Sequence, residues 1–335
     1  MRFLFELSGE HPTLPAREAL AVLSLAGPSA VLDEDEGVLV AEAPPQAKGW
    51  LPRLAMSHSV LEHLASVPAR REDVLEALAG AKGRLGATFA VRATRMGGAG
   101  RELSVATLER EAGARLAQPA RVDLRAPETE VRAVLAARAH VGLLLHRVDR
   151  AAFESRHVRR RPFFAPITVH PRLARCMANL ARVRSGERVL DPFCGTGGLA
   201  IEAGLLGARV TVGDLDPRMV EGAAHALEAA GVRHESRVAD AAQAALSGAP
   251  WDAILTDPPY GRGASSHREP RLALYRRALD AFAKALRPGG RLVAAFPDPA
   301  VIPLVREVLT VEEVHAVRVH KSLTRQVVVA RKDDG

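Results

Sequence analysis

Residues 189–198 read Val189-Leu-Asp-Pro-Phe-Cys-Gly-Thr-Gly-Gly198, and later in the chain residues 257–260 read Asp257-Pro-Pro-Tyr260. The first stretch begins as a short apolar run and becomes glycine-rich, which is typical of a buried strand that turns into a helix. Glycine has no Cβ, so the backbone of such a turn can approach a ligand closely. The second stretch follows the apolar run 253–256. Both stretches are therefore expected at the carboxyl ends of strands, where open α/β sheets bind ligands.

Around these two stretches, from about residue 188 onward, the sequence alternates regularly between strand and helix patterns. The expected strands are 188–191, 209–214, 235–238, 253–256, 291–296, a stretch within 311–320, and 326–331. Helical patterns fall between most of them, which indicates a mostly parallel sheet covered by helices on both faces. The last two strands follow each other closely, as in an antiparallel edge. The sequence therefore predicts an α/β domain with a Rossmann-like, mostly parallel seven-stranded sheet.

The first half of the chain has a different pattern, which predicts two small α+β units. For the first unit we expect a strand at 2–7, a helix at 15–25 and a hairpin around the acidic turn 33–37. For the second unit we expect helices at 72–81 and 104–116, strands at 88–93, 121–125 and 141–148, and a helix that starts at Pro127.

Three acidic residues, Asp191, Asp214 and Asp240, follow three successive strands of the predicted sheet. We expect Asp214 to accept the ribose hydroxyls of a nucleoside and Asp240 to meet an adenine amino group. Asp191 is unfavourable beside a pyrophosphate but favourable near a sulfonium and an α-amino group. S-adenosylmethionine therefore fits this turn better than a nicotinamide cofactor does. Turn and helix-cap roles are the alternative interpretation, above all for Asp240.

The motif Asp257-Pro-Pro-Tyr260 offers hydrogen-bond acceptors to a primary amine. Two successive prolines have a fixed φ and no amide hydrogen, which leaves the Asp257 carboxylate and the carbonyl of Pro258 as two acceptors. Hydrogen bonding both amine hydrogens directs the nitrogen lone pair toward a methyl donor, and Asp257 can take up the released proton. Tyr260 offers a face on which a flipped base stacks. With the cofactor turn, this motif predicts methyl transfer to a nucleobase nitrogen; an ordinary Pro-Pro turn is the alternative.

Length and composition limit the other possibilities. The 335 residues, 47% of them hydrophobic, predict two or three globular domains. No apolar run reaches the length of a membrane span, no export leader is recognisable, and Cys176 and Cys194 are too few for a disulfide framework or a zinc site. We therefore expect a cytoplasmic protein without a membrane anchor or a metal. Between residues 150 and 184 there are nine arginines and one acid, a local charge of +8 against +7 for the whole chain, and this basic stripe predicts phosphate contacts.

The motifs resemble those of the amino-methyltransferase branch of class I S-adenosylmethionine-dependent enzymes. With its amino-terminal half, the chain resembles the THUMP-containing archaeal tRNA methyltransferases that modify the exocyclic N2 of guanosine 10. The matching stretches are 55–58, 162–166, 170–175, 177–180, 191–198, 257–261 and 320–325. The resemblance implies a ferredoxin-like α+β domain at 1–65, a THUMP RNA-binding domain at 66–150, a basic linker at 151–165 and a class I methyltransferase domain at 166–335.

Motifs and resemblance together predict three groups of site residues. The catalytic residues are Asp257, Pro258, Pro259 and Tyr260. The cofactor-binding residues are Asp191, Pro192, Gly195, Thr196, Gly197, Asp214, Leu215, Asp240, Ala241 and Asn179. The RNA-contacting residues are Arg159, Arg160, Arg161, Gly261, Arg262, Lys321, Ser322 and Arg325. For Asn179, a capping or core role fits equally well.

The resemblance implies tRNA as the substrate and S-adenosylmethionine as the cofactor, with one or two methyl groups added to N2 of a guanosine. Two alternatives keep the same chemistry: N2-guanine methylation of ribosomal RNA, for which the resemblance would favour Asn in place of Asp257, and N6-adenine methylation of nucleic acid. A third is an RNA-binding protein with a vestigial catalytic fold. A small activating protein subunit is left open as a partner, and otherwise a monomer is expected.

Overall fold

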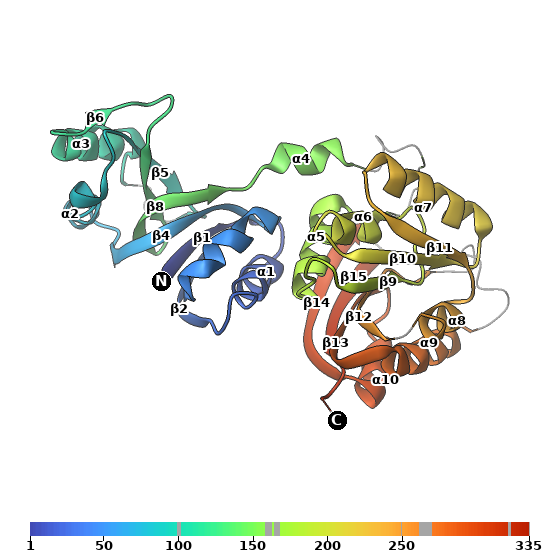
Figure 1. Ribbon diagram of the computed structural model, residues 1–335. Helices are drawn as coiled ribbons and strands as arrows, with labels where there is room; N and C mark the ends of the chain where they lie inside the picture. Colours follow the sequence, from blue (N-terminus) through green and yellow to red (C-terminus); the bar gives the residue numbers. More distant parts are fainter. Residues whose placement is uncertain are drawn as a thin grey trace. The chain divides into compact units, whose positions relative to one another are not determined.

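The computed structural model describes residues 1–98, 102–157, 163, 168–248, 250–260, 270–320 and 323–334, with the backbone alone at residues 246 and 320. The chain divides into two compact units, Met1–Val148 and Asp149–Gly335. Each unit is built on a β-sheet of its own (Figure 1).

The first unit contains a mixed sheet, coloured blue to green in Figure 1, whose strand order in the described residues is β2-β3-β1-β4-β8-β7-β5-β6. The strands are β1 (Arg2–Leu7), β2 (Ala30–Asp35), β3 (Val38–Glu42), β4 (Ser57–Pro68), β5 (Thr88–Arg95), β6 (Arg121–Val122), β7 (Thr129–Leu135) and β8 (Arg138–Arg147). The helices are α1 (Leu14–Leu23), α2 (Arg71–Ala79) and α3 (Val105–Leu116), with 3-10 turns η1 (Pro45–Arg53) and η2 (Lys82–Arg84). Helices α2 and α3 pack on this sheet over the fully buried Phe89, Val131 and Val141.

The long strand β4 crosses residue 65, where we expected a domain boundary. It pairs with β1 on one side and with β8 on the other, so residues on both sides of 65 contribute to one sheet. A buried ion pair also spans this sheet, because Arg132 Nη1 on β7 lies 3.0 Å from Glu6 Oε2 on β1. Sequence patterns gave no strand at 57–68, where residues that favour helices, such as Leu and Glu, interrupt the alternation.

The helix that we expected to start at Pro127 is wrong, because Thr129–Leu135 is strand β7. This strand pairs in parallel with β5 and antiparallel with β8. The acidic residue Glu130, which suggested the first turn of a helix, instead accepts a hydrogen bond from Arg147 on β8 (2.9 Å). Pairing with two neighbouring strands outweighs the local signal here, since strand formation depends strongly on tertiary context.

The second unit contains a mostly parallel sheet, whose strand order in the described residues is β11-β10-β9-β12-β13-β15-β14. The strands are β9 (Arg188–Asp191), β10 (Arg209–Asp214), β11 (His234–Val238), β12 (Trp251–Thr256), β13 (Leu286–Phe296), β14 (Thr310–His320) and β15 (Leu323–Arg331). The helices are α4 (Arg150–Ser155), α5 (Pro171–Leu180), α6 (Gly198–Gly204), α7 (Pro217–Ala229), α8 (Ala241–Leu246), α9 (Arg271–Ala285) and α10 (Val301–Val308). Helix α6 contacts α5 and α7, while α9 contacts α8 and α10, which confirms the predicted α/β architecture (Figure 1). No helix of the described chain has both the length and the apolar composition needed to cross a membrane.

The antiparallel part of this sheet brings one end of β15 to the carboxyl edge of the parallel strands. Strand β15 inserts between β13 and β14 and runs antiparallel to both. Gln326, near the start of β15, therefore pairs with Phe296 at the end of β13. The sequence predicted an antiparallel pair but not this insertion, which places Arg325 beside the ends of the parallel strands.

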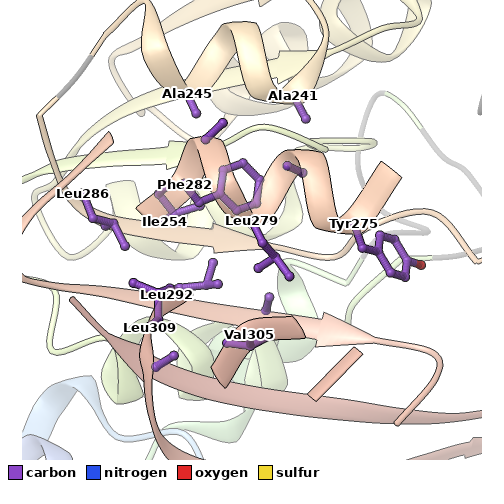
Figure 2. Packing of buried hydrophobic residues seen from close by; sticks show 14 of the residues in the cluster. Ala241, Ala245, Ile254, Tyr275, Leu279, Phe282, Leu286, Leu292, Val305 and Leu309 are labelled. Carbon is purple, nitrogen blue, oxygen red and sulfur yellow. The ribbon is translucent and has the colours of Figure 1, made fainter. Parts of the chain in front are cut away.

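A continuous apolar core fixes α9 against the sheet, as Figure 2 shows. Ile254 on β12, Phe282 on α9 and Leu292 on β13 are each at most 1% exposed. Complete burial of such a side chain contributes roughly 1.5–3 kcal/mol relative to exposure. The ring of Tyr275 belongs to the same cluster, and its hydroxyl lies at the edge of the cluster (Figure 2). The core thereby holds the carboxyl end of β12, from which Asp257 follows.

Candidate active site

The glycine-rich turn connects β9 to α6 and exposes bare backbone. Gly197 caps α6 in the left-handed conformation, with φ at +74°, which a residue with a Cβ rarely adopts. Gly195 also has a positive φ, +47°, and a Cβ built there would meet no atom within 4 Å. The turn is therefore shaped to receive a ligand against its main chain, as the sequence predicted.

Asp191 ends β9 just before this turn, and its side chain is almost completely buried. Thr256, the last residue of β12, donates a hydrogen bond from its hydroxyl to Asp191 Oδ1 (3.1 Å). Burial, with the nearby charges of Asp257 and Asp214, raises the pKa of the Asp191 carboxyl to about 8, although the hydrogen bond from Thr256 opposes the shift. Asp191 therefore carries a proton near neutral pH unless a cation lies beside it.

Asp214 ends β10 and is tied directly to the glycine-rich turn. Its Oδ2 accepts a hydrogen bond from the backbone amide of Gly195 (3.2 Å), and its Oδ1 accepts one from the amide of Asp216 (3.0 Å). Burial raises the pKa of Asp214, although these amides oppose the shift. Next to it, Leu215 is 42% exposed at the mouth of the strand ends. The structure thus brings Asp191, Asp214 and the turn together at one edge.

Asp240 is a helix cap that is also bound by an arginine. Its carboxylate accepts a hydrogen bond from the amide of Ala242 at the start of α8 (3.0 Å). Arg277 on α9 donates to both oxygens, at 2.6 and 3.0 Å, and this interaction lowers the pKa of Asp240. The capping alternative is therefore confirmed for Asp240. The role of Asp240 in binding an adenine remains a prediction.

Other predicted cofactor residues lie in or near the same turn. The hydroxyl of Thr196 lies 3.2 Å from the hydroxyl of Thr168, which joins the turn to the segment before α5. Asn179 is fully buried within α5, a helix that contacts α6. Ala241 is buried at the start of α8. These positions are consistent with one binding region around the turn.

The motif that follows β12 forms a compact cluster with Arg325. The hydroxyl of Tyr260 donates a hydrogen bond to Asp257 Oδ1, and Arg325 Nη2 donates one to Asp257 Oδ2 (3.1 Å). Arg325 Nε also donates to the Tyr260 hydroxyl. Burial raises the pKa of Asp257 to about 6, while Arg325 and the Tyr260 hydrogen bond oppose that shift. The Asp257 carboxyl group therefore changes between its protonated and ionised forms within about one pH unit of neutrality.

The backbone of the same motif is fastened to α9. Tyr275 donates a hydrogen bond from its hydroxyl to the carbonyl oxygen of Pro259 (2.6 Å), and Arg271 Nη1 donates to the carbonyl of Tyr260 (3.1 Å). The carbonyl of Pro259 therefore has a structural partner, and the carbonyl of Pro258 is the acceptor predicted for an amine. These two hydrogen bonds to α9 limit the motion of the tetrapeptide backbone.

The predicted RNA-contacting residues are mostly outside the described part of the chain. This applies to Arg159, Arg160, Arg161, Gly261, Arg262, Lys321 and Ser322. Arg325 is described, but it is only 4% exposed and binds Asp257 instead of lying on an open surface.

The basic stripe at 150–184 is in part a structural feature. Arg172 and Arg175 are buried, at 2% and 7% exposure. Arg175 and Arg156 both bind the fully buried Glu202, each at 2.8 Å. The prediction of phosphate contacts is wrong for Arg175, because a buried guanidinium paired with a carboxylate is not available to RNA. Burial also removes Arg172 from the surface. The count of charges along the sequence could not reveal a partner that lies on α6.

Sequence reasoning missed three residues that shape this site: Thr256, Tyr275 and Arg277. Thr256 directly precedes the tetrapeptide, so its position at a strand end was a signal that could have been used. Tyr275 and Arg277 lie on α9, and no local motif marks them. Their roles depend on the packing of α9 beside β12 and α8.

This geometry can be compared with known proteins. Residues 158–327 match the UPF0020 family, described as an RMKL-like methyltransferase domain. The crystal structure of TrmN from Thermus thermophilus is similar to this chain, with a TM-score of 0.54 and 26% identity, and the match covers 99% of this chain and 100% of that one. Fold and site therefore define a methyltransferase.

Two archaeal relatives show to which family of methyltransferases the chain belongs. The tRNA (guanine(10)-N2)-dimethyltransferase of Methanothermobacter thermautotrophicus is 37% identical over 339 residues, which cover 99% of this chain and 100% of the relative. The enzyme of the same name from Pyrococcus abyssi is 36% identical, and the match covers 82% of this chain and 83% of the relative. The chain belongs to the tRNA (guanine(10)-N2)-dimethyltransferase family.

Proposed function

We propose that this protein transfers methyl groups from S-adenosylmethionine to the exocyclic N2 of guanosine 10 in tRNA. The observation that carries the proposal is the Asp257 carboxylate, held at the carboxyl end of β12 near a glycine-rich turn, the buried Asp191 and the partly buried Asp214. Because these two archaeal relatives are named tRNA (guanine(10)-N2)-dimethyltransferases, we favour two successive transfers. The same relationship favours tRNA over ribosomal RNA or an adenine N6 substrate.

The residues of the turn fit S-adenosylmethionine on chemical grounds. The charges of Asp214 and Asp257 add to the effect of burial on Asp191, so a cationic ligand would stabilise the ionised forms of all three. When bound, S-adenosylmethionine supplies an electrophilic methyl group on a cationic sulfur, together with a cationic α-amino group. Asp191 would hold these positive groups, and Asp214 would accept the ribose hydroxyls. The remaining proposed contacts are Pro192, Gly195, Thr196, Gly197, Leu215, Asp240, Ala241 and Asn179.

The tetrapeptide would orient the amine that is methylated. Asp257 accepts one N2 hydrogen and the carbonyl of Pro258 accepts the other, which directs the nitrogen lone pair to the methyl group. As the new nitrogen–carbon bond forms, the electron pair of the carbon–sulfur bond stays with sulfur. Asp257 then accepts the proton that N2 loses. Tyr260 supplies the face on which the flipped guanine stacks.

We further propose that the other residues predicted from the sequence guide the RNA. The basic residues Arg159, Arg160, Arg161, Arg262 and Lys321, with Gly261 and Ser322, would contact the tRNA around the site. The unit at residues 1–148 would grip the acceptor end of the tRNA through its THUMP domain. This division follows the proposed organisation into ferredoxin-like, THUMP, linker and methyltransferase parts.

The test is methylation of two tRNA transcripts that differ only in having guanosine or adenosine at position 10. We expect N2-methylated guanosine from the first transcript alone, identified by mass spectrometry of the nucleosides. Changing Asp257→Asn removes the charge and the proton acceptor, so turnover should fall by about 100-fold or more while binding of S-adenosylmethionine and tRNA persists.

The control variant is Asp280→Asn, which removes an exposed carboxylate on α9. It should keep the turnover of the unmodified enzyme. Equal methylation of both transcripts would contradict the assigned position. Undiminished turnover of Asp257→Asn would contradict the role of that carboxylate.

A further inference from the structure

Three side chains close around one another at the carboxyl end of the sheet: Asp257, Tyr260 and Arg325. Each contacts the other two, and the Arg325 guanidinium also lies 5.2 Å from the centroid of the Tyr260 ring. We infer that Arg325 is a positioning residue that keeps the Asp257 carboxylate ionised and oriented, and that the Tyr260 hydroxyl is the partner that the substrate amine replaces. The inference rests on the proposed function of this site.

The first step of the argument is the burial of the pair. The side chains of Arg325 and Asp257 are 4% and 13% exposed. A buried carboxylate is unstable unless a charge and hydrogen bonds compensate for its lost hydration. Arginine remains protonated at every pH of interest and presents several donors in a fixed plane. Arg325 is therefore suited to hold Asp257 charged while the reaction proceeds.

The second step concerns the other charged and titratable groups near Asp257. Tyr260 in the same segment is neutral, because burial raises its pKa, with Asp257 as a further cause. The negative charge of Asp257 raises the pKa of Asp191 on β9. Tyr275 on α9 directs its hydroxyl to the carbonyl of Pro259. Of the described groups that act on the pKa of Asp257, Arg325 is the cation that opposes the effect of burial.

The third step asks which of the two donors to Asp257, Arg325 or Tyr260, gives up its hydrogen bond to the substrate amine. Each Asp257 oxygen already accepts one hydrogen bond inside a buried cluster, so an incoming amine competes for space with the donor that is held less firmly. The bond from Arg325 is charge-assisted on both sides and comes from a strand paired with two neighbours. The bond from Tyr260 comes from a neutral hydroxyl at the end of the tetrapeptide. The Tyr260 hydroxyl is therefore the donor that gives up its hydrogen bond to Asp257. This change also frees the ring of Tyr260 to stack on the base.

The experiment compares Arg325→Gln and Arg325→Lys with the unmodified full-length protein. Single-turnover methylation of tRNA is measured against pH at saturating S-adenosylmethionine. In the unmodified enzyme the rate should rise with pH as Asp257 ionises, and this acid limb of the pH–rate profile should have its midpoint near pH 6. Without the cation, the midpoint of this limb in Arg325→Gln should rise by about 1–2 pH units. At a fixed pH below the midpoint, each unit of this rise lowers the ionised fraction of Asp257 about tenfold.

Activity of Arg325→Gln should recover at alkaline pH, and Arg325→Lys, which keeps the charge, should shift the limb less. The affinity for tRNA should change little. The matched control is Arg276→Gln, which removes an exposed arginine paired with Glu307 on the same unit. Its limb should coincide with that of the unmodified enzyme.

A second readout is independent of the reaction. The Asp257 carboxyl carbon is identified by NMR from the signal that disappears in Asp257→Asn, and it is titrated without cofactor or RNA. Its midpoint should rise in Arg325→Gln. An unchanged midpoint, or a uniform loss of activity with an unchanged acid limb, would overturn the inference and leave Arg325 a structural residue.

Weaker tRNA binding with an unchanged limb would also overturn it, and would return Arg325 to the RNA contact that the sequence suggested. Failure of the proposed function is distinguishable from these outcomes. In that case the unmodified enzyme would not methylate guanosine 10, whereas the titration of Asp257 would still respond to Arg325.

Discussion

At the scale of single residues, burial changes what an aspartate can do. Asp191 ends an ordinary strand in the sequence, yet in the folded chain it is 2% exposed and its carboxyl group has a pKa of about 8. In the unfolded chain the pKa would lie near 3.8. At this group the folded state therefore binds more protons than the unfolded state between these values, so the contribution of Asp191 to the free energy of unfolding falls as pH rises from about 4 to about 8.

The first prediction follows for Asp191→Asn. The amide has no charge to bury, so the variant should be more stable than the unmodified protein by an amount that grows from about pH 5 to about pH 8, reaching a few kcal/mol. Binding of S-adenosylmethionine should be lost, since the positive groups lose their partner. Urea unfolding is followed by the fluorescence of the buried Trp251 in a Trp50→Phe background, which reports on the second unit.

The control is Asp280→Asn in the same background, whose stability difference should not vary with pH. A stability gain of Asp191→Asn that stayed constant with pH would mean that the carboxyl group is not protonated in the free protein. Retained cofactor affinity would contradict the proposed contact.

At the scale of elements, Gly197 in the β9–α6 turn can be compared with Gly186, which precedes β9. Gly197 and Gly186 both have a φ in the left-handed region, at +74° and +84°. A Cβ at Gly186 would meet nothing within 4 Å, whereas one at Gly197 would lie 3.2 Å from the Cβ of Ala223 on α7. Only Gly197 lies in the turn that is proposed to receive the cofactor. The pair therefore separates backbone strain from ligand binding.

We predict that Gly186→Ala lowers the free energy of unfolding by about 1–2 kcal/mol, the strain of a left-handed alanine, and that Gly197→Ala lowers it by at least as much, because its Cβ also crowds Ala223. Only Gly197→Ala should also weaken S-adenosylmethionine binding, because it alters the backbone that faces the ligand. Calorimetric titration and urea unfolding measure the two effects. If Gly186→Ala weakened cofactor binding equally, the loss would reflect instability and not the shape of the turn.

At the scale of the whole molecule, the two units have separate sheets and separate cores. Every residue of the proposed cofactor site belongs to residues 149–335, so the second unit contains the chemistry. Removing residues 1–148 should therefore leave the affinity for S-adenosylmethionine unchanged. The affinity for tRNA should fall by about 100-fold, because two linked binding modules gain affinity from each other.

This prediction is measured by calorimetry for the cofactor and by filter binding for tRNA. Trp251 fluorescence confirms that the shortened chain is folded. Equal tRNA affinity of the shortened and full-length proteins would contradict the division of labour between the units.

The sequence by itself determined the strand and helix order of the second unit. It also placed Asp191, Asp214 and Asp257 at strand ends. Period-two and helical hydrophobic patterns and glycine-rich turns act over a few residues, so a linear reading captures them. The sequence was less reliable in the first unit, where β4 was missed and β7 was taken for a helix. Those strands are decided by pairing with partners distant in the chain.

Only the tertiary structure decided which charged side chains meet. Arg325 lies 68 residues from Asp257 in the sequence, and the two meet because β15 inserts antiparallel beside β13. Arg175 and Arg156 bind Glu202 for a similar reason, since α4 and α5 lie together beside α6. An ion pair depends on distance and burial, and both are fixed by the packing of strands and helices that no local stretch of sequence specifies.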